Sequence, residues 1–263
     1  MPLSEARAFA ESIAGALDRH EVASTWAPGE LPGPPSPELA ALLDDLGWAT
    51  LAQDEALLAC AGLGATELGL RLASVHHVDR LLGGSPSAGD LVRSLGAERL
   101  AVACQRGTVI RRPIVSSEPV ASADGLEVHR VLEVGEPVAE VPPTALAAWR
   151  AACAGYLAGL GKAALDLTVA YVRQRRAFGS TLAALGPVQQ LLADAATAVS
   201  GVLLVAGEGP DSDALAYAGP AVAQACAACQ QVTGAIGFTL EYPLHRYTQR
   251  AQALATWNDA LLE

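Results

Sequence analysis

The chain has 263 residues, of which 51% are apolar but only 5% aromatic. A core built mainly from alanine, leucine and valine favours packed helices over sheets. The net charge of −11 argues against nucleic acid or an anionic membrane as the main partner. Five cysteines, an odd number, indicate reduced thiols in a cytoplasm, and the N-terminus shows no secretory signal.

The N-terminal third is expected to be helical. Hydrophobic spacing predicts helices over 4–18, 37–46 and 65–82. A loop rich in proline and glycine over 26–36 separates the first two, and Ser36 is expected to cap the second.

A β-rich stretch follows over 100–141. Runs at 100–104, 108–110 and 126–132 resemble short strands between turn residues. A barrel of eight strands needs roughly 60 residues. This stretch is too short for one, so we expect a reduced β-rich insert.

The C-terminal part is predicted to be helical again, beginning with a long helix over 145–176. Small residues recur along it at every fourth position, at Ala151, Gly155, Gly159 and Ala163. Such a stripe lets another helix approach closely, although each glycine costs about 1 kcal/mol of helix propensity.

Three more helices are expected after it. One begins at Pro187, one is capped by Asp213 and kinked or divided by Pro220, and the last covers 244–262. Four such elements predict an antiparallel bundle. No stretch is typical of a membrane span, 214–229 coming closest.

Three regions are therefore expected in a mostly α chain. These are an N-terminal helical region (1–99), the truncated β-rich middle region (100–143) and the C-terminal helical bundle (144–263).

Arginines gather where the long helix is expected to end. Arg173, Arg175 and Arg176 precede Phe178 and Gly179. They could simply offset the dipole of the helix C-terminus. Alternatively, a guanidinium fork could bind pyrophosphate oxygens while Phe178 packs against a ring system.

A second cluster combines glutamines and glycines, in the run from Gln230 and Gln231 to Gly234 and Gly237. Glycine lets a backbone approach a ligand, and glutamine offers both a donor and an acceptor. Taken in isolation, the run is better explained by a helix C-cap followed by a tight turn. It is no dinucleotide fingerprint, because no strand precedes it.

Together the clusters resemble the acyl-CoA dehydrogenase family. Three ordered runs, 170–179, 188–194 and 231–246, are similar to that family's arginine-x-x-phenylalanine-glycine run, its next helix and its glutamine-glycine turn. Residues 37–49 match more weakly. The resemblance implies an acyl-CoA dehydrogenase-like fold.

The resemblance also implies FAD shared across a subunit interface. In this family one subunit donates such residues to the ADP half of its neighbour's flavin. The donated, cofactor-binding residues here would be Arg175, Phe178, Gly179, Gln231, Gly234 and Gly237. Ala235 replaces a usual glycine, and Gly186 stands where the family often has glutamine.

The family's catalytic glutamate has no counterpart. Its two usual positions fall at or beside Asn258 and near Trp149. Neither side chain takes up a proton at neutral pH, so no catalytic residue is assigned. Asp259 and Glu263 are the nearest carboxylates that could substitute.

Metal binding is not expected. Cys226 and Cys229 share a helix face without a second ligand pair, and His76 and His77 point in different directions. A di-iron bundle needs repeated Glu-x-x-His motifs, which the sequence does not contain.

The resemblance predicts one subunit of a heteromeric, flavin-dependent acyl-CoA dehydrogenase, such as a heterotetramer. A full-length dehydrogenase subunit would carry the base and bind most of the acyl-CoA. Steroid side-chain thioesters are among the candidate substrates. Two alternatives stay open: a self-sufficient homo-oligomer with a displaced base such as Asp259, and a flavin-free interaction protein.

Overall fold

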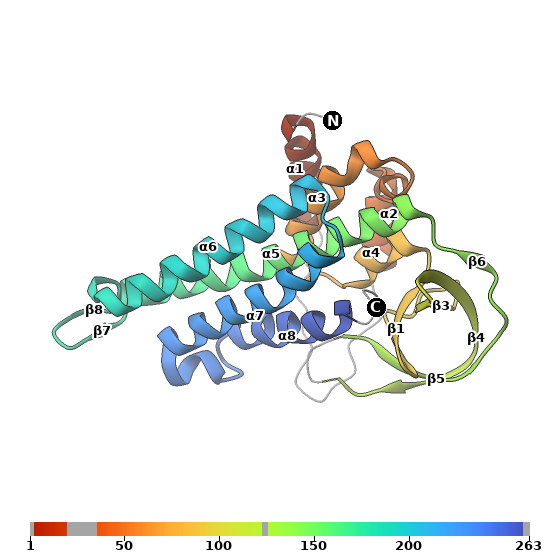
Figure 1. Ribbon diagram of the computed structural model, residues 1–263. Helices are drawn as coiled ribbons and strands as arrows, with labels where there is room; N and C mark the ends of the chain where they lie inside the picture. Colours follow the sequence, from red (N-terminus) through yellow and green to blue (C-terminus); the bar gives the residue numbers. More distant parts are fainter. Residues whose placement is uncertain (1–2, 20–35, 123–125, 260–263) are drawn as a thin grey trace.

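The structure is a computed structural model that describes residues 3–19, 36–122 and 126–259. Most of the loop predicted over 26–36, and Glu263, lie outside these residues. Long helices form a bundle, with a small barrel at one end and the N-terminal helices packed on top (Figure 1). The expectation of a mostly α chain with a reduced β region and a C-terminal helical bundle is confirmed.

The longer helical elements follow the chain in this order: α1 (Leu3–Arg19), α2 (Pro37–Asp45), α3 (Leu58–Leu70), α4 (His76–Asp79), α5 (Pro143–Gln174), α6 (Gly186–Glu208), α7 (Ser212–Thr233) and α8 (Leu244–Asp259). Ser36 caps α2 as predicted, its Oγ accepting a hydrogen bond from Leu39 N at 3.2 Å.

The prediction of a single helix over 65–82 is wrong. The chain instead forms α3 and the short α4, because Leu72 adopts a left-handed conformation (φ 53°) that ends the first helix. The apolar periodicity continues across the break, so spacing alone did not reveal it.

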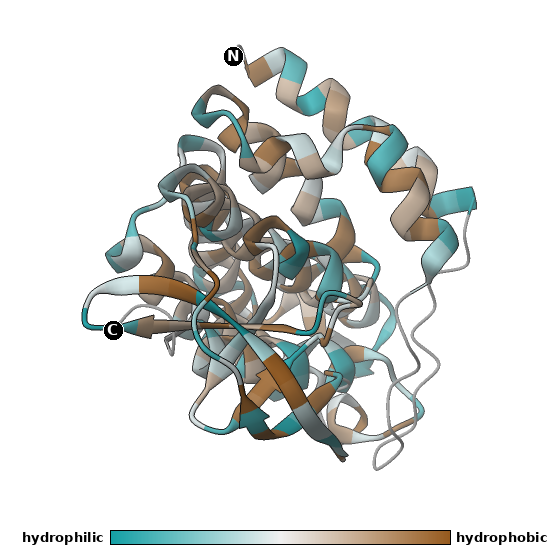
Figure 2. Cartoon of the chain, turned by 90° about the vertical axis from the view of Figure 1, so that its right-hand side faces the viewer, coloured by the Kyte–Doolittle hydropathy of each residue, from teal (hydrophilic) through white to brown (hydrophobic). Residues whose placement is uncertain are grey.

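The six main strands are β1 (Ser85–Ala88), β2 (Leu91–Arg93), β3 (Leu100–Gln105), β4 (Thr108–Val120), β5 (Val128–Val134) and β6 (Ala139–Glu140). Their order is β3-β1-β2-β5-β4-β6, and β3 also pairs with β4. That extra pairing closes β1 to β5 into a ring, seen end-on in Figure 1. Figure 2 shows apolar stretches alternating with polar ones on these strands.

The sequence prediction of this β-rich region needs two corrections. Strands β1 and β2 precede residue 100, in the stretch that was assigned to the N-terminal helical region. Pro113 does not break β4, because proline loses only its N–H, and its carbonyl oxygen accepts a hydrogen bond from Gly135 N at 2.8 Å.

The small-residue stripe of α5 packs against α3 as predicted. A Cβ added at Gly155 would lie 1.9 Å from the backbone oxygen of Gly62, and one at Gly159 would lie 2.2 Å from that of Thr66. Backbones this close leave no room for any side chain. Helix α5 is consequently the central helix, buried along most of its length.

Helices α6 to α8 complete the bundle around α5. Asp211, and not Asp213, caps α7, with its Oδ1 accepting from Ala214 N at 2.9 Å; Pro220 lies within α7, which continues as one helix. By length and composition α6 could cross a bilayer, whereas the sequence had singled out 214–229. Only 22% of its most apolar window is buried, and Leu204 is 68% exposed.

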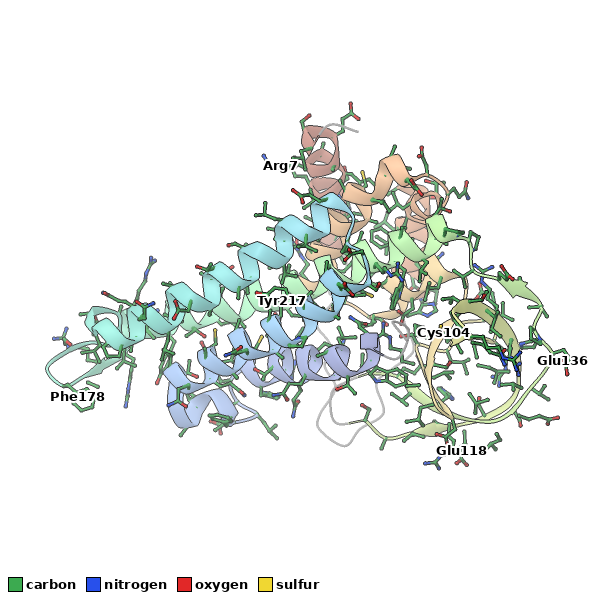
Figure 3. The ribbon with its side chains drawn as sticks, viewed as in Figure 1. Arg7, Cys104, Glu118, Glu136, Phe178 and Tyr217 are labelled. Atoms are coloured by element: carbon green, nitrogen blue, oxygen red, sulfur yellow. The ribbon has the colours of Figure 1, made fainter. Side chains whose placement is uncertain are left out.

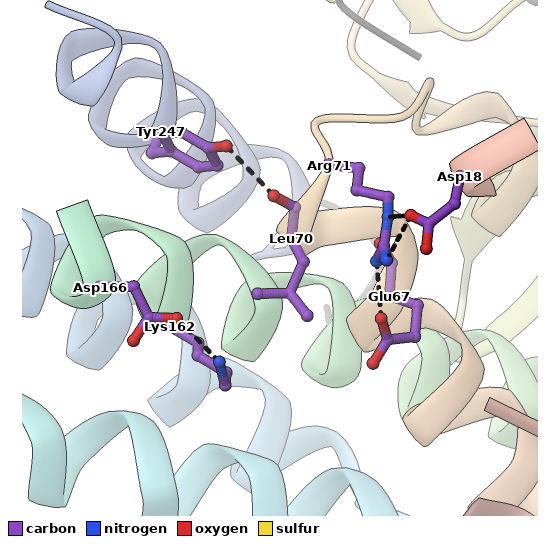
Figure 4. Close-up of polar contacts among 7 residues, drawn as sticks. All are labelled: Asp18, Glu67, Leu70, Arg71, Lys162, Asp166 and Tyr247. Carbon is purple, nitrogen blue, oxygen red and sulfur yellow. Dashed lines mark hydrogen bonds and ion pairs between the residues drawn. The ribbon is translucent and has the colours of Figure 1, made fainter. Parts of the chain in front are cut away.

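Polar contacts join the N-terminal helices to the bundle (Figure 4). Arg71, after α3, forms ion pairs with Asp18 of α1 at 2.8 Å and with Glu67 at 2.7 Å. Tyr247 of α8 donates a hydrogen bond to the Leu70 carbonyl at 3.1 Å. The end of α3 is thereby tied to helices from both ends of the chain.

The buried imidazole of His77 makes stability depend on pH. It is fully buried, and neither ring nitrogen has a hydrogen-bond partner among the described residues. Burial lowers the pKa of His77 from 6.5 to about 3, with smaller effects from His76 and Arg80. The unfolded chain therefore takes up this proton below pH 6.5, whereas the folded protein resists it.

We expect the folded state to lose roughly 2 kcal/mol through His77 between pH 7 and pH 5. His77→Leu should remove this loss, so the stability difference between variant and wild type should shift in favour of the variant as the pH falls. Urea unfolding at both pH values measures it. Parallel pH profiles for the two proteins would contradict the assignment.

Candidate functional site

A two-residue hairpin forms the tip of the bundle. Helix α5 ends at Gln174, and β7 (Arg176–Ala177) pairs with β8 (Ser180–Thr181). Phe178 and Gly179 connect them with φ of 53° and 81°. Two successive positive φ values are typical of the tight turn that matches strand twist.

The hairpin presents Phe178 to solvent. Its side chain is 91% exposed and lies at the far end of the molecule from the barrel (Figure 3). A positive φ is uncommon for a bulky residue. The turn therefore holds the ring outward. No residue in the described part of the chain covers it.

The tip is also the basic part of an acidic protein. Residues 167–193 contain Arg173, Arg175 and Arg176 but no aspartate, glutamate or lysine. All three guanidinium groups are exposed, and within the described chain neither Arg173 nor Arg175 forms an ion pair. Unpaired guanidinium groups beside an exposed ring suit an anion attached to a planar heterocycle.

The glutamine-glycine run forms the turn between α7 and α8. Helix α7 ends at Thr233, and a short 3-10 turn covers Gly234–Phe238. Gln231 is exposed, whereas Gln230 donates a hydrogen bond from Nε2 to the Gly237 carbonyl at 3.1 Å. The turn therefore has the C-cap geometry that was the alternative interpretation of this run.

The two glycines of this turn have different surroundings. Gly234 has φ 69° and open space where a Cβ would point, so a ligand could approach its backbone. At Gly237 a Cβ would lie 2.1 Å from Thr233 Oγ1, so packing alone explains that glycine. The cofactor roles assigned to both residues stay predictions.

The structure brings the two clusters to the same end of the bundle. The hairpin and the α7–α8 turn lie at the end opposite to the barrel (Figure 1). Phe238 and Leu240 beside the turn are exposed by 64% and 63%. The barrel, by contrast, exposes acidic side chains such as Glu118 and Glu136 (Figure 3).

The two expected positions of the base meet inside the protein. Trp149 of α5 donates a hydrogen bond from Nε1 to Asp79 Oδ1 at 3.0 Å. Asn258 of α8 accepts one at Oδ1 from Arg93 Nη1 at 3.2 Å. Residues 109 positions apart thus contact one ion pair, Asp79 with Arg93.

The ion pair is bidentate and sealed from solvent. Arg93 donates from Nε to Asp79 Oδ2 at 3.0 Å and from Nη2 to Oδ1 at 2.9 Å. Its guanidinium also lies 5.9 Å from the ring centre of Trp257. Burial alone lowers the pKa of Arg93, but the Asp79 carboxylate outweighs it and the pKa is raised. We call Asp79, Arg93, Trp149 and Asn258 the buried cluster; each is at most 1% exposed.

The structure supplies no replacement base here. Asn258 cannot accept a proton at neutral pH, and the Asp79 carboxylate already accepts three hydrogen bonds. Only the backbone of Asp259 is described, and Glu263 lies outside the described residues.

The thiols and imidazoles do not form a metal centre in the described chain. Cys226 and Cys229 are buried, and burial raises the pKa of both thiols. The rings of His76 and His77 lie edge to face with centroids 6.1 Å apart.

Comparison with known proteins identifies the fold. Residues 139–209 match the family model described as acyl-CoA dehydrogenase, C-terminal domain. A search of curated proteins found no match. The resemblance to the acyl-CoA dehydrogenase family is confirmed, and the chain has the acyl-CoA dehydrogenase fold.

Three solved structures illustrate the likeness. The ChsE4-ChsE5 complex from Mycobacterium tuberculosis has 16% identity and a TM-score of 0.69, covering 99% of this chain and 96% of that one. The Tcur3481-Tcur3483 steroid ACAD G363A variant gives 18%, 0.67 and the same coverage. A glutaryl-CoA dehydrogenase from Mycobacterium smegmatis with FADH2 gives 16% and 0.62, covering 97% of this chain and 90% of that one.

Sequence reasoning missed Asp79 and Arg93. It located Trp149 and Asn258 only as positions without a base. Asp79 was expected inside the helix over 65–82, and no element was predicted around Arg93, so nothing paired them. The available signal was an arginine directly after the apolar pair Leu91 and Val92, because a buried arginine needs a carboxylate partner.

Proposed function

We propose that this chain is the non-catalytic subunit of a heteromeric, flavin-dependent acyl-CoA dehydrogenase. It would lend its bundle tip to the ADP half of an FAD held mainly by a full-length partner subunit. Bound flavin supplies the hydride acceptor for the α,β-desaturation of an acyl-CoA thioester. The partner would carry the base and bind most of the substrate. The complex would lie in the cytoplasm.

One observation carries the proposal: the cofactor half-site and the missing base lie in different parts of the chain. Arg175 and Phe178 are both exposed, and Phe178 lies at the opposite end of the molecule from the chain's own barrel. The base positions are buried with Trp149 and Asn258 in them. A flavin bound at the tip would therefore be one that another subunit brings to it.

The residues at the tip fit a pyrophosphate-linked adenine group. The Arg175 guanidinium has no ion-pair partner in the described chain, and Gly179 and Gly234 leave open space beside their backbones. Fork-shaped guanidinium donors match phosphate oxygens, and an exposed ring can stack on a heterocycle. Gln231, exposed on the neighbouring turn, could add a donor and an acceptor.

The names of similar structures support a partner and a substrate class. Two of them name pairs of chains, and one names a steroid ACAD. We accordingly propose an unequal-subunit complex, such as a heterotetramer, that acts in lipid degradation, with steroid side-chain thioesters as a candidate substrate class. The exposed apolar side chains of the tip, Phe178, Phe238 and Leu240, are suited to burial against such a partner.

Flavin absorbance separates this proposal from its two alternatives. Yellow protein only on co-expression with a neighbouring dehydrogenase gene supports the heteromer. Yellow protein from this chain alone supports a self-sufficient homo-oligomer with a displaced base such as Asp259. Colourless preparations under both conditions would support the second alternative, a flavin-free interaction protein, and would overturn the proposal.

Arg175→Ala should lower the flavin content of the co-expressed complex by about tenfold at limiting FAD, because a charge-assisted hydrogen bond of roughly 1.5 kcal/mol is lost. Lys162→Ala is the matched control. Lys162 is an exposed cation on the same helix, but it pairs with Asp166 at 2.8 Å. The ratio of absorbance at 450 nm to protein measures occupancy. Equal occupancy in the two variants would refute the role of Arg175.

A further inference from the structure

The buried cluster lies where the two expected base positions meet. Trp149 comes from α5, Asn258 from α8, Asp79 from α4 and Arg93 from β2. One ion pair therefore holds together the bundle, the barrel and the segment between them. A reacting thioester would have to enter between these same elements.

Side chains already fill this position. The Arg93 guanidinium donates to Asp79 with two nitrogens and to Asn258 with the third. Trp257 covers one side of it, and the Cys153 thiol lies within its hydrogen-bonding reach. Each of the three guanidinium nitrogens therefore already has a hydrogen-bond partner inside the protein.

The cavity next to the cluster is too small to replace an acyl-CoA pocket. It has a volume of about 190 Å³ and borders Asp79, between the Trp48 region and the barrel strands. Pockets for ligands of drug size measure roughly 300–1,000 Å³. Its walls include the polar side chains His76, Ser85 and Ser94, which do not suit an acyl chain.

We propose that Arg93 closes this chain's own reacting centre: its ion pair with Asp79 seals the space between α5, α8 and the barrel, so no acyl thioester enters there. This inference rests on the proposed function, because it explains why the partner subunit must bind the substrate. It goes further by assigning the closure to one ion pair that solvent does not reach.

Cys153 can report whether the centre is closed. This thiol is buried beside Arg93, and burial raises its pKa. Cys104 on β3 is only half-buried and lies in the same chain. N-ethylmaleimide is smaller than the pantetheine arm of coenzyme A, so a centre open to a thioester would also admit it to Cys153.

The test is maleimide labelling of the full chain and of the co-expressed complex, mapped by mass spectrometry. We expect Cys153 to react at least 100-fold more slowly than Cys104. Arg93→Ala should accelerate labelling of Cys153 at least tenfold, because the space that the guanidinium leaves admits water and the reagent to the thiol. Trp149→Ala opens the cluster from α5 and serves if Arg93→Ala does not fold.

Two results would overturn the inference. One is labelling of Cys153 at a rate similar to Cys104 in the unmodified protein. The other is continued protection of Cys153 in a folded variant that has lost Arg93. Failure of the proposed function is distinct, because it appears as a complex without flavin whatever the labelling of Cys153.

Discussion

Replacing Gly155 with alanine is expected to lower the free energy of unfolding by about 3 kcal/mol or more, among the largest effects of any single methyl group in this chain. The added Cβ would lie 1.9 Å from the Gly62 carbonyl oxygen, a backbone atom that no rotamer change can move. Relief requires α3 and α5 to separate. That separation would loosen the neighbouring contacts of Gly159 and Gly69 as well.

Gly201→Ala is the matched control for this prediction. Gly201 lies within α6. A Cβ added there would have no neighbouring atom within 4 Å, apart from the backbone of its own helix. Alanine there should stabilise the protein by about 0.5–1 kcal/mol, because alanine favours helix more than glycine does. Urea denaturation measures both variants. A Gly155→Ala protein as stable as wild type would show that the two helices are not in close contact.

Breaking the Asp79–Arg93 ion pair from one side is expected to cost roughly 3–5 kcal/mol, since it leaves a single charge buried without its partner. Arg93→Met strands the Asp79 carboxylate, and Asp79→Leu strands the guanidinium and also removes the acceptor of Trp149 Nε1. The double variant contains neither charge. It should therefore be more stable than the sum of the two single effects predicts.

The exposed pair of Arg130 with Glu118 provides the comparison. Their atoms lie 3.1 Å apart, but the two side chains are about half exposed. Arg130→Met should change the free energy of unfolding by less than about 1 kcal/mol. A double-mutant cycle by chemical denaturation yields the coupling energy of the buried pair. Additive effects at Asp79 and Arg93 would contradict the coupling that we assign to them.

The sequence predicted best the features that repeat along the chain. The stripe of Ala151, Gly155, Gly159 and Ala163 predicted the close approach of another helix, because a four-residue repeat lies on one helix face. The match of Arg175, Phe178 and Gly179 to a family run predicted a cofactor half-site. The structure places that run on an exposed tip, and its role in binding stays a prediction.

Features that depend on distant residues could not be predicted. Strands β1 and β2 are short and lack the apolar alternation of a strand, so only their partners β3 and β5 define them. Arg93 becomes intelligible only when Asp79 and Asn258 are placed beside it by the fold. The hairpin at Phe178 was missed because a bulky aromatic residue seldom occupies a positive-φ turn position.

The uneven distribution of charge along the chain has a consequence for assembly kinetics. Three exposed arginines lie at one end, in a stretch of the sequence (167–193) that contains no aspartate or glutamate. A partner with an acidic docking surface would therefore be steered toward this basic end. Because the Debye length is about 10 Å at 0.1 M salt, this steering acts over short range and weakens as salt is added. Salt should therefore slow the encounter of the two subunits more than it loosens the complex once formed.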